Sequence, residues 1–445
     1  MHFGLEGAMP LFLYLAAIAA FLASVFWRPE IGIYFIVPFF PLQEIRYRII
    51  QYPLGNKLID IILLGVILGI LFRKDFRFLS RNPLNKPLFI LCIFLYVSLW
   101  QGWMFLGGDM PLSPEDPRFS AWKNYMVMPL AFILVVSVIK DVKQMKILIV
   151  LMCLSALVAD RSINTNIGGH DLSHFTYTMR EGGVFGYAGA NGAGTFAGQF
   201  ALVLLGLCAY EKRKVVRLAA LALAGFTTYC LMLTFSRGAY AGFLVGVTFL
   251  ALLKERKILV LLIPFLLTWQ AIVPASVHER VTTTYNESSS ELEPSAADRV
   301  TLWEDAADLV THYPLLGTGF NTYGYMHRVS EYRDTHNYFL KVLVETGIAG
   351  LLLFLWVVFG MWAVTYRLFR TGSDPFLKSL GLGLVTALAC CLINNLFGDR
   401  WTYIEEAGFL WVLLGCVVRG LMLTKQASEQ EKEPMYEAAA LEALP

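Results

Sequence analysis

Four of the seven histidines of this 445-residue chain lie in one polar stretch, residues 275–346. One of them, His336, stands in the sequence RDTHNYFLKVLVETGIAG, which predicts a helix that starts near Asp334 and Thr335 and continues into an apolar run. A histidine in the first turn of a helix is favoured in its neutral form by the positive end of the helix dipole. Neutral imidazole can take a proton from a hydroxyl group, which is the task of a general base. The alternative is that His336 only caps the helix or binds lipid headgroups.

Two arginines could act beside this histidine. Arg237, in LTFSRGAYAG, lies between two apolar runs, where a charge is costly and indicates a functional site. Arg299 lies in a predicted helix of the polar stretch, on the same face as Trp303. Guanidinium groups match phosphate oxygens bidentately, so the arginines and His336 together suit the binding of a phosphate or diphosphate while a hydroxyl is deprotonated beside it. The alternatives are that Arg237 snorkels to lipid headgroups and that Arg299 is a solvated surface residue.

Four further side chains are weaker candidates for substrate binding. Arg180 precedes a glycine-rich segment and could contact the same phosphate. Trp303, Tyr323 and Tyr338 could stack on sugar rings, although aromatic residues at a membrane interface often only pack.

The sequence lacks the common motifs of metal and nucleotide enzymes. It contains no H-E-x-x-H, no acidic D-x-D, no P-loop and no G-x-G-x-x-G before a helix. All seven cysteines lie in apolar runs and have no zinc-ligand spacing, which indicates packing residues. We therefore expect no metal and no cofactor, and a membrane-resident donor for any transfer reaction. The net charge of +2 does not indicate a nucleic-acid partner.

Composition predicts the elements that must position these residues. The chain is 57% hydrophobic and only 16% charged, and apolar runs long enough to cross a bilayer recur along it. The sequence therefore predicts an all-α polytopic membrane protein with about 12 or 13 transmembrane helices. The run at 30–42 contains Pro38 and Pro41, which favours a broken or re-entrant segment there.

The predicted organisation has four parts. We expect N-terminal transmembrane helices in 1–274, a periplasmic catalytic loop with two helices in 275–346, C-terminal transmembrane helices in 347–424 and a cytoplasmic tail in 425–445. Short basic loops alternate with polar or acidic ones, and basic loops are typical of the cytoplasmic side. The basic segments are 73–86, 140–146, 211–217, 254–257 and 366–370. The long loop is therefore expected to face the periplasm or cell exterior.

Three segments in this order carry a resemblance to a known family. SRGAYAGFL, then RVTLWEDA with HYPLLGTGFNTY, then THNYFLKVLVETGIAGLLLFL are similar to the O-antigen ligase/polymerase superfamily of bacterial envelopes. The resemblance covers roughly residues 186–370, and it is closest to the lipopolysaccharide O-antigen ligase branch. It implies a GT-C-like glycosyltransferase of the bacterial inner membrane that takes its glycan from undecaprenyl diphosphate.

The resemblance also implies roles for particular residues. Arg237 and Arg299 would bind the diphosphate of the donor, and His336 would act as the general base. The acceptor in the ligase branch is a hydroxyl of lipid A–core, and the reaction is inverting and metal-independent.

Other functions remain open on sequence alone. An O-antigen or exopolysaccharide polymerase and a protein O-oligosaccharyltransferase differ from the ligase mainly in the acceptor. A polysaccharide transporter would show inverted repeats with broken helices at the midplane, which are not visible here. A passive assembly protein would keep its activity without His336.

Overall fold

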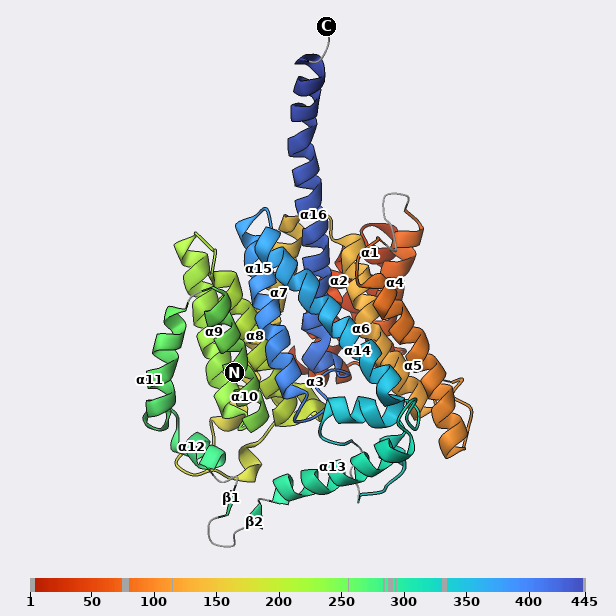
Figure 1. The fold of residues 1–445 in the computed structure, drawn as a ribbon, viewed down its shortest axis with the longest axis vertical. Coiled ribbons are helices and arrows are strands. Elements are labelled where there is room, and N and C mark those ends of the chain that lie inside the picture. Colours follow the sequence, from red (N-terminus) through yellow and green to blue (C-terminus); the bar gives the residue numbers. More distant parts are fainter. Residues whose placement is uncertain are drawn as a thin grey trace.

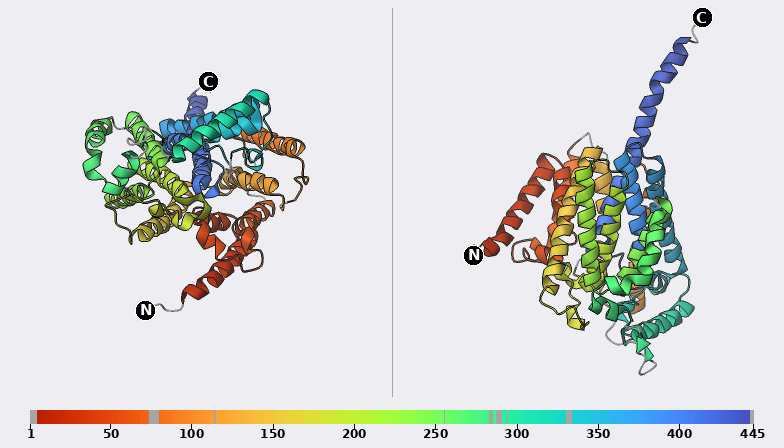
Figure 2. Two further views of the ribbon diagram at one scale, coloured as in Figure 1. Left: turned by 90° about the horizontal axis from the view of Figure 1, so that it is seen from below. Right: turned by 90° about the vertical axis from the view of Figure 1, so that its left-hand side faces the viewer.

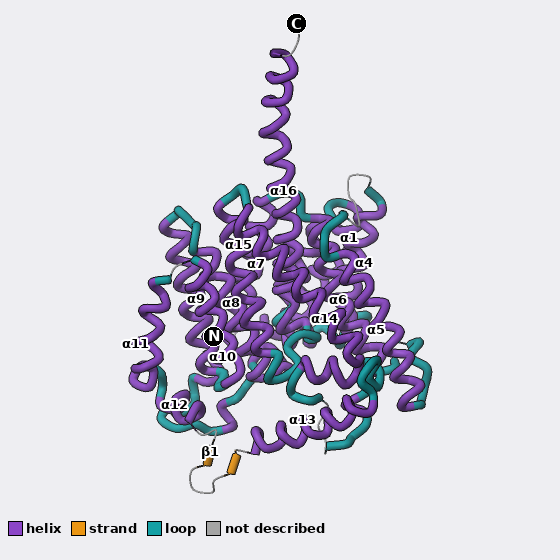
Figure 3. Tube along the Cα trace, in the orientation of Figure 1, coloured by secondary structure: helices purple, strands orange, loops and turns teal. Residues whose placement is uncertain are grey.

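The long apolar runs form a bundle of helices, seen in a computed structural model of the protein (Figure 1). The structure describes residues 5–73, 80–113, 115–254, 256–282, 285–286, 291–292, 294–329 and 334–442. In this part of the chain the secondary structure is helical except for one antiparallel pair of two-residue strands (Figure 3). The predicted all-α polytopic class is confirmed. The main helices of the first half are α1 (Leu5–Phe26), α2 (Glu30–Ile36), α3 (Gln43–Tyr47), α4 (Leu58–Leu71), α5 (Asn85–Leu106), α6 (Pro117–Val138), α7 (Val142–Ile167) and α8 (Gly189–Cys208). The remaining elements are α9 (Lys214–Leu233), α10 (Arg237–Leu253), α11 (Lys257–Ile272), α12 (Ala275–Thr282), β1 (Tyr285–Asn286), β2 (Glu291–Leu292), α13 (Pro294–His312), α14 (Tyr338–Thr371), α15 (Pro375–Asn394) and α16 (Ile404–Glu442).

Nine of the described helices are long and apolar enough to cross a membrane. They are α1, α5, α6, α7, α8 with the turn before it, α9, α14, α15 and α16. Each of the four other predicted runs is also helical, but shorter: α2, α4, α10 and α11. The segment expected to be broken at its prolines is α2 followed by a 3-10 turn, Val37–Phe39. The predicted count of 12 or 13 includes these shorter helices.

The centre of the bundle is formed by α8, α15 and α16, whose membrane segments are the most buried. Small residues allow α8 and α15 to pack closely: a Cβ atom added at Gly206 would lie only 2.2 Å from the Cα atom of Gly383. Trp401 and Trp411 contact each other, fill the space between α16 and its neighbours, and are almost fully buried. The outer helices α1 and α9 expose most of their apolar surface. The central helices α8 and α15 contribute Asn191, Thr195 and Asn394 to the site described below.

The described parts of the predicted basic loops lie together at the end of the bundle from which α16 projects (Figures 1 and 2). Arg419 of α16 donates to the carbonyl of Lys140 at 3.3 Å, and the amide of Ser373 donates to Thr424 Oγ1 at 3.4 Å. The polar loops meet at the other end, where Gln101 Nε2 donates to the Gly317 carbonyl at 2.7 Å. The alternation of loops is thus reproduced as two opposite ends. The compartment that each end faces stays a prediction.

The polar stretch holds one more helix than the two that were predicted. The additional helix is α12, which directly follows α11, and α13 lies across the end of the bundle (Figures 1 and 2). The predicted boundary between residues 346 and 347 falls at a kink, because Gly347 has φ 63° inside α14. A Cβ atom at Gly347 would lie 2.3 Å from the Leu315 carbonyl, so only glycine fits there. The first turns of α14 therefore belong with the polar stretch, and the membrane span follows the kink.

Candidate active site

Five arginines and one histidine line a cavity of about 200 Å³ at the end of the bundle where the polar loops meet. Among the described residues, Asp298 is the only acidic one in this lining. Five guanidinium groups against one carboxylate give the lining an excess of positive charge, which suits an anionic ligand. The charged residues of the lining are Arg180, Arg237, Arg280, Asp298, Arg299, His336 and Arg400, and we call this space the arginine cavity.

The structure brings all four sequence-predicted polar candidates into this one cavity. Arg237 is the first residue of α10, directly after its N-cap Ser236. Arg299 lies in the first half of α13, and Arg180 follows a short 3-10 turn before α8. Arg180 donates to the Asn191 side-chain oxygen at 2.7 Å, so its guanidinium group is held against the start of α8. These residues lie up to 156 positions from His336 in the sequence, and only folding brings them together.

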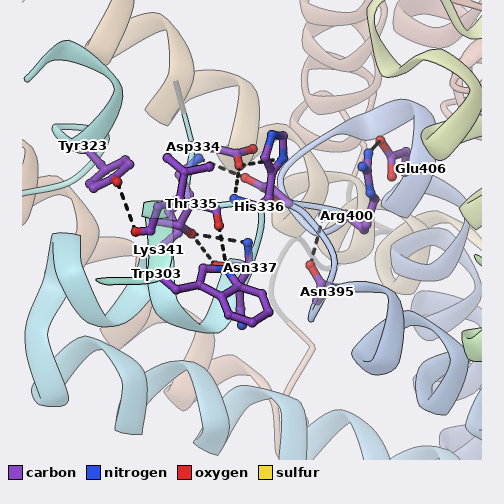
Figure 4. A network of polar contacts seen from close by, with 12 residues as sticks. Trp303, Tyr323, Asp334, Thr335, His336, Asn337, Lys341, Asn395, Arg400 and Glu406 are labelled. Atoms are coloured by element: carbon purple, nitrogen blue, oxygen red, sulfur yellow. Dashed lines mark hydrogen bonds and ion pairs between the residues drawn. The ribbon is translucent and has the colours of Figure 1, made fainter. Parts of the chain in front are cut away.

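His336 is held by the segment that precedes α14. Its backbone amide donates to the Asp334 carboxylate, and its Nδ1 lies 3.3 Å from Asp334 Oδ1. Figure 4 shows the imidazole beside Asp334, with the Arg400–Glu406 ion pair on its other side. A neutral ring whose Nδ1–H points to this carboxylate leaves Nε2 able to accept a proton.

The helix start was predicted about three residues too early. Helix α14 begins at Tyr338, and its N-cap is Asn337, whose side chain accepts from the Leu340 amide at 3.2 Å. His336 therefore precedes the N-cap and is not in the first helical turn. Its backbone has φ 49°, a left-handed conformation that is uncommon outside glycine.

The surroundings of His336 favour its neutral form. Burial lowers the pKa of His336, and the positive charges of Arg299 and Arg400 lower it further, against the opposing charge of Asp334. Part of the ring remains accessible, since 37% of the side chain is exposed. The expected neutral imidazole is therefore favoured, but by burial and neighbouring arginines rather than by a position inside the helix.

Sequence reasoning missed Arg280 and Arg400. Arg280 is on α12, is almost fully buried, and stacks on Phe175 with its guanidinium carbon 4.9 Å from the ring centre. Arg400 lies in the turn between α15 and α16 and pairs with Glu406 at 3.0 Å. Both follow closely on a long apolar run, as Arg237 does, and that shared position is the signal that could have found them.

Two of the predicted sugar-stacking residues have packing and hydrogen-bonding positions outside the cavity. Trp303 Nε1 donates to the Thr335 carbonyl at 3.0 Å, which ties α13 to the segment before α14. Tyr323 is buried and its hydroxyl donates to Asp305 Oδ2 at 3.0 Å. Both side chains therefore hold the loop in place.

The third aromatic candidate, Tyr338, lines a second and larger cavity of about 420 Å³. The two cavities are neighbours, because the segments 336–338 and 400–405 contribute residues to both. Among the described residues, no group of three or more histidine, cysteine, aspartate or glutamate side chains gathers at a possible metal site. A metal-independent reaction stays a prediction.

Fold and site together define a polytopic membrane protein with an arginine-lined cavity at one end of its bundle. Residues 219–355 match the family model described as O-antigen ligase. This match includes Arg237, Arg299 and His336, while Arg180 and Arg400 lie outside it.

The curated relatives of this chain are named as polysaccharide ligases. A protein of Rickettsia bellii named "Putative polysaccharide ligase" is 26% identical over 233 residues, which are 48% of this chain and 54% of the relative. Relatives from Rickettsia typhi and Rickettsia felis with the same description are each 28% identical, over 29% and 32% of this chain and 36% and 38% of their own lengths. The matches thus span about half or less of the curated relatives. These comparisons support the O-antigen ligase superfamily, to which the chain is similar over residues 219–355.

Proposed function

We propose that the protein is a membrane glycosyltransferase that moves a glycan from undecaprenyl diphosphate to a hydroxyl of lipid A–core. The observation that carries this proposal is the arginine cavity, in which five guanidinium groups surround a histidine that burial keeps neutral. The family match and the names of the relatives support a ligase-type reaction on a polysaccharide. The donor, the acceptor and the residue roles are our own inference.

In the proposed reaction the diphosphate of the donor binds among Arg237, Arg299 and their neighbours. His336 Nε2 takes the proton of the acceptor hydroxyl as that oxygen attacks the anomeric carbon. The bond between the anomeric carbon and the diphosphate oxygen breaks, and its electron pair leaves with undecaprenyl diphosphate. The arginines stabilise the negative charge that develops on this leaving group. A single displacement of this kind inverts the anomeric configuration.

Asp334 has a positioning role in this scheme. Its carboxylate lies 3.3 Å from His336 Nδ1, so it orients the ring and stabilises the imidazolium that forms during transfer. In this scheme His336 accepts the proton, and the arginines stabilise the negative charge of the diphosphate. The catalytic loop is proposed to face the periplasm, where lipid A–core is presented.

The proposal is tested with purified protein, undecaprenyl-diphosphate oligosaccharide and lipid A–core, in buffer with a chelator. We expect glycan attached to lipid A–core, with inverted linkage, and release of undecaprenyl diphosphate. A ladder of lengthened donor would identify a polymerase, and glycosylation of an added acceptor protein would identify a protein O-oligosaccharyltransferase. No transfer to any of these acceptors would overturn the glycosyltransferase proposal.

A further inference from the structure

The larger cavity differs from the arginine cavity in its charge. It is lined by parts of α3, α4, α6, α14 and the start of α16, and its lining holds both basic and acidic side chains. Three of the basic groups are in ion pairs: Lys123 with Asp60 at 2.6 Å, Lys341 with Asp399 at 3.0 Å, and Arg46 with Glu405. Because these charges compensate one another, the cavity has little attraction for a phosphate and instead presents many hydrogen-bonding groups.

Aromatic rings lie at the rim of this cavity. Tyr47 of α3 and Tyr187, just before α8, make an edge-to-face pair with ring centres 6.2 Å apart. Tyr187 is 86% exposed and Tyr47 is 41% exposed, so both rings are open to a ligand. Tyrosine combines a flat apolar face with a polar hydroxyl, and the apolar C–H face of a sugar ring packs well on such a surface.

Deeper in the cavity, a buried carboxylate presents an unsatisfied atom. Glu345 is only 3% exposed, and its Oε2 accepts from the Asn321 amide at 3.0 Å. Its Oε1 has no hydrogen-bond partner within the described part of the chain. A buried acceptor without a donor is costly, so a hydroxyl group arriving in the cavity would make a favourable bond there.

The two cavities are lined by neighbouring residues of the same two chain segments. His336 lines the arginine cavity, and Tyr338, two residues later, lines the larger one. Likewise Arg400 lines the first and Thr402 the second. A sugar in the larger cavity would therefore lie beside the chain segments that also line the site of the diphosphate.

We propose that the larger cavity binds the sugar that carries the accepting hydroxyl, with Tyr47 and Tyr187 stacking on its ring and Glu345 accepting from one of its other hydroxyls. This inference rests on the proposed glycosyl transfer, and it assigns the two substrates to two cavities of opposite character. The same sugar chemistry is offered by the core end of lipid A–core and by the end of a second undecaprenyl-linked glycan. Glu345 is a binding residue in this scheme, distinct from the proton-accepting His336.

The experiment measures the KM of each substrate separately, with full-length protein in lipid nanodiscs and undecaprenyl-diphosphate oligosaccharide as donor. Lipid A–core is the acceptor in one arm, and a second undecaprenyl-diphosphate oligosaccharide is the acceptor in the other. Tyr187→Ala should raise the KM of the acceptor about fivefold or more and leave the KM of the donor within about twofold, since one stacked ring is lost. Tyr187→Phe, which keeps the ring, should resemble the unchanged protein.

Glu345→Gln should raise the KM of the acceptor about tenfold, because the amide puts an N–H donor in place of one of the two oxygens that can accept from the hydroxyl. Glu304→Gln, an exposed change on α13 outside both cavities, is its control. If Glu345→Gln does not fold, the comparison of Tyr187→Ala with Tyr187→Phe at this exposed position tests the assignment of the cavity by itself. Unchanged acceptor KM in the folded variants, or an equal rise for the donor, would overturn the assignment while the transfer itself stands. If the unchanged protein transfers to neither acceptor, the proposed function fails and this inference fails with it.

Discussion

At the scale of the residue, the geometry of the guanidinium group matters more than its charge. Arg237→Lys keeps one positive charge but loses the planar pair of donors that can grip two phosphate oxygens. A hydrogen bond to a charged group contributes about 1.5–3 kcal/mol, so we expect glycan transfer to fall roughly 10- to 100-fold. The measurement is initial rate against donor concentration in purified protein.

A matched control is Arg328→Lys, because Arg328 is on the same end of the molecule, pairs with Asp305 and Asp308, and does not line the arginine cavity. This variant should keep near-normal transfer. Equal transfer rates for Arg237→Lys and Arg328→Lys would show that the guanidinium group of Arg237 does not bind the diphosphate of the donor bidentately.

The titration of His336 makes a prediction about pH. Burial holds the pKa of His336 below its usual value, so the ring stays neutral, and transfer should stay fast, down to a pH below about 6.5. Asp334→Asn removes the stronger of the two neighbouring carboxylate charges, Asp334 and Asp298, that raise this pKa, so the acid limb of the rate profile should move to still lower pH. The maximal rate should also fall, since the ring loses the group that orients it. His336→Ala should abolish transfer and leave donor binding intact.

The control for these variants is His312→Ala, an exposed histidine of α13 that does not line the arginine cavity. Its pH profile should match that of the unchanged protein. A profile for Asp334→Asn that moves to higher pH would contradict the assigned direction, and substantial transfer by His336→Ala would remove the general base.

At the scale of the element, the site depends on how α13 is docked to the segment before α14. Trp303 provides this docking through its bond to the Thr335 carbonyl, one residue from His336. Trp303→Phe keeps the ring packing but leaves that carbonyl without its donor, which costs about 1 kcal/mol. We expect a loss of transfer of about fivefold, with the KM of the donor nearly unchanged, measured beside Glu304→Gln. A rate equal to that of the control would show that this bond does not position His336.

The sequence predicted the existence of these elements better than their ends. Asp334, Thr335 and Asn337 are all good capping residues, so local preference could not decide which of them starts α14. In the fold the Asn337 side chain makes the capping bond, and His336 is left outside the helix. In the same way, Arg280 and Arg400 looked like other arginines at the ends of apolar runs. Their convergence depends on tertiary packing that no local pattern encodes.

At the scale of the whole molecule, the arrangement of loops predicts the result of a labelling experiment. Thr311 on α13 and Arg213 before α9 are both exposed, at opposite ends of the bundle. In cells with a permeabilised outer membrane, Thr311→Cys should react with a membrane-impermeant maleimide, and Arg213→Cys should react only after the inner membrane is disrupted. The unchanged chain is the control, because its cysteines are buried or half-buried in membrane helices. The reverse pattern would invert the orientation and exclude a periplasmic site.

The bundle itself was largely predictable, because long apolar runs and charged loops follow directly from the physics of a bilayer. The separation of the two cavities was not. The larger cavity is built from residues between Gln43 and Glu405, most of which look ordinary in sequence. Glu345 lies in the segment THNYFLKVLVETGIAG, but that segment alone does not show that its carboxylate lines a cavity.

The left-handed backbone of His336 implies a trade-off between the stability of the fold and the activity of the site. An L-residue in this conformation costs about 1–2 kcal/mol, and glycine avoids that cost. His336→Gly should therefore unfold at a higher denaturant concentration than His336→Ala, by about 1 kcal/mol in the free energy of unfolding, although both variants lack the imidazole. If the two variants unfold alike, the strain is absent. If they differ as expected, the fold carries a permanent local cost at the position of the side chain that takes the proton of the acceptor.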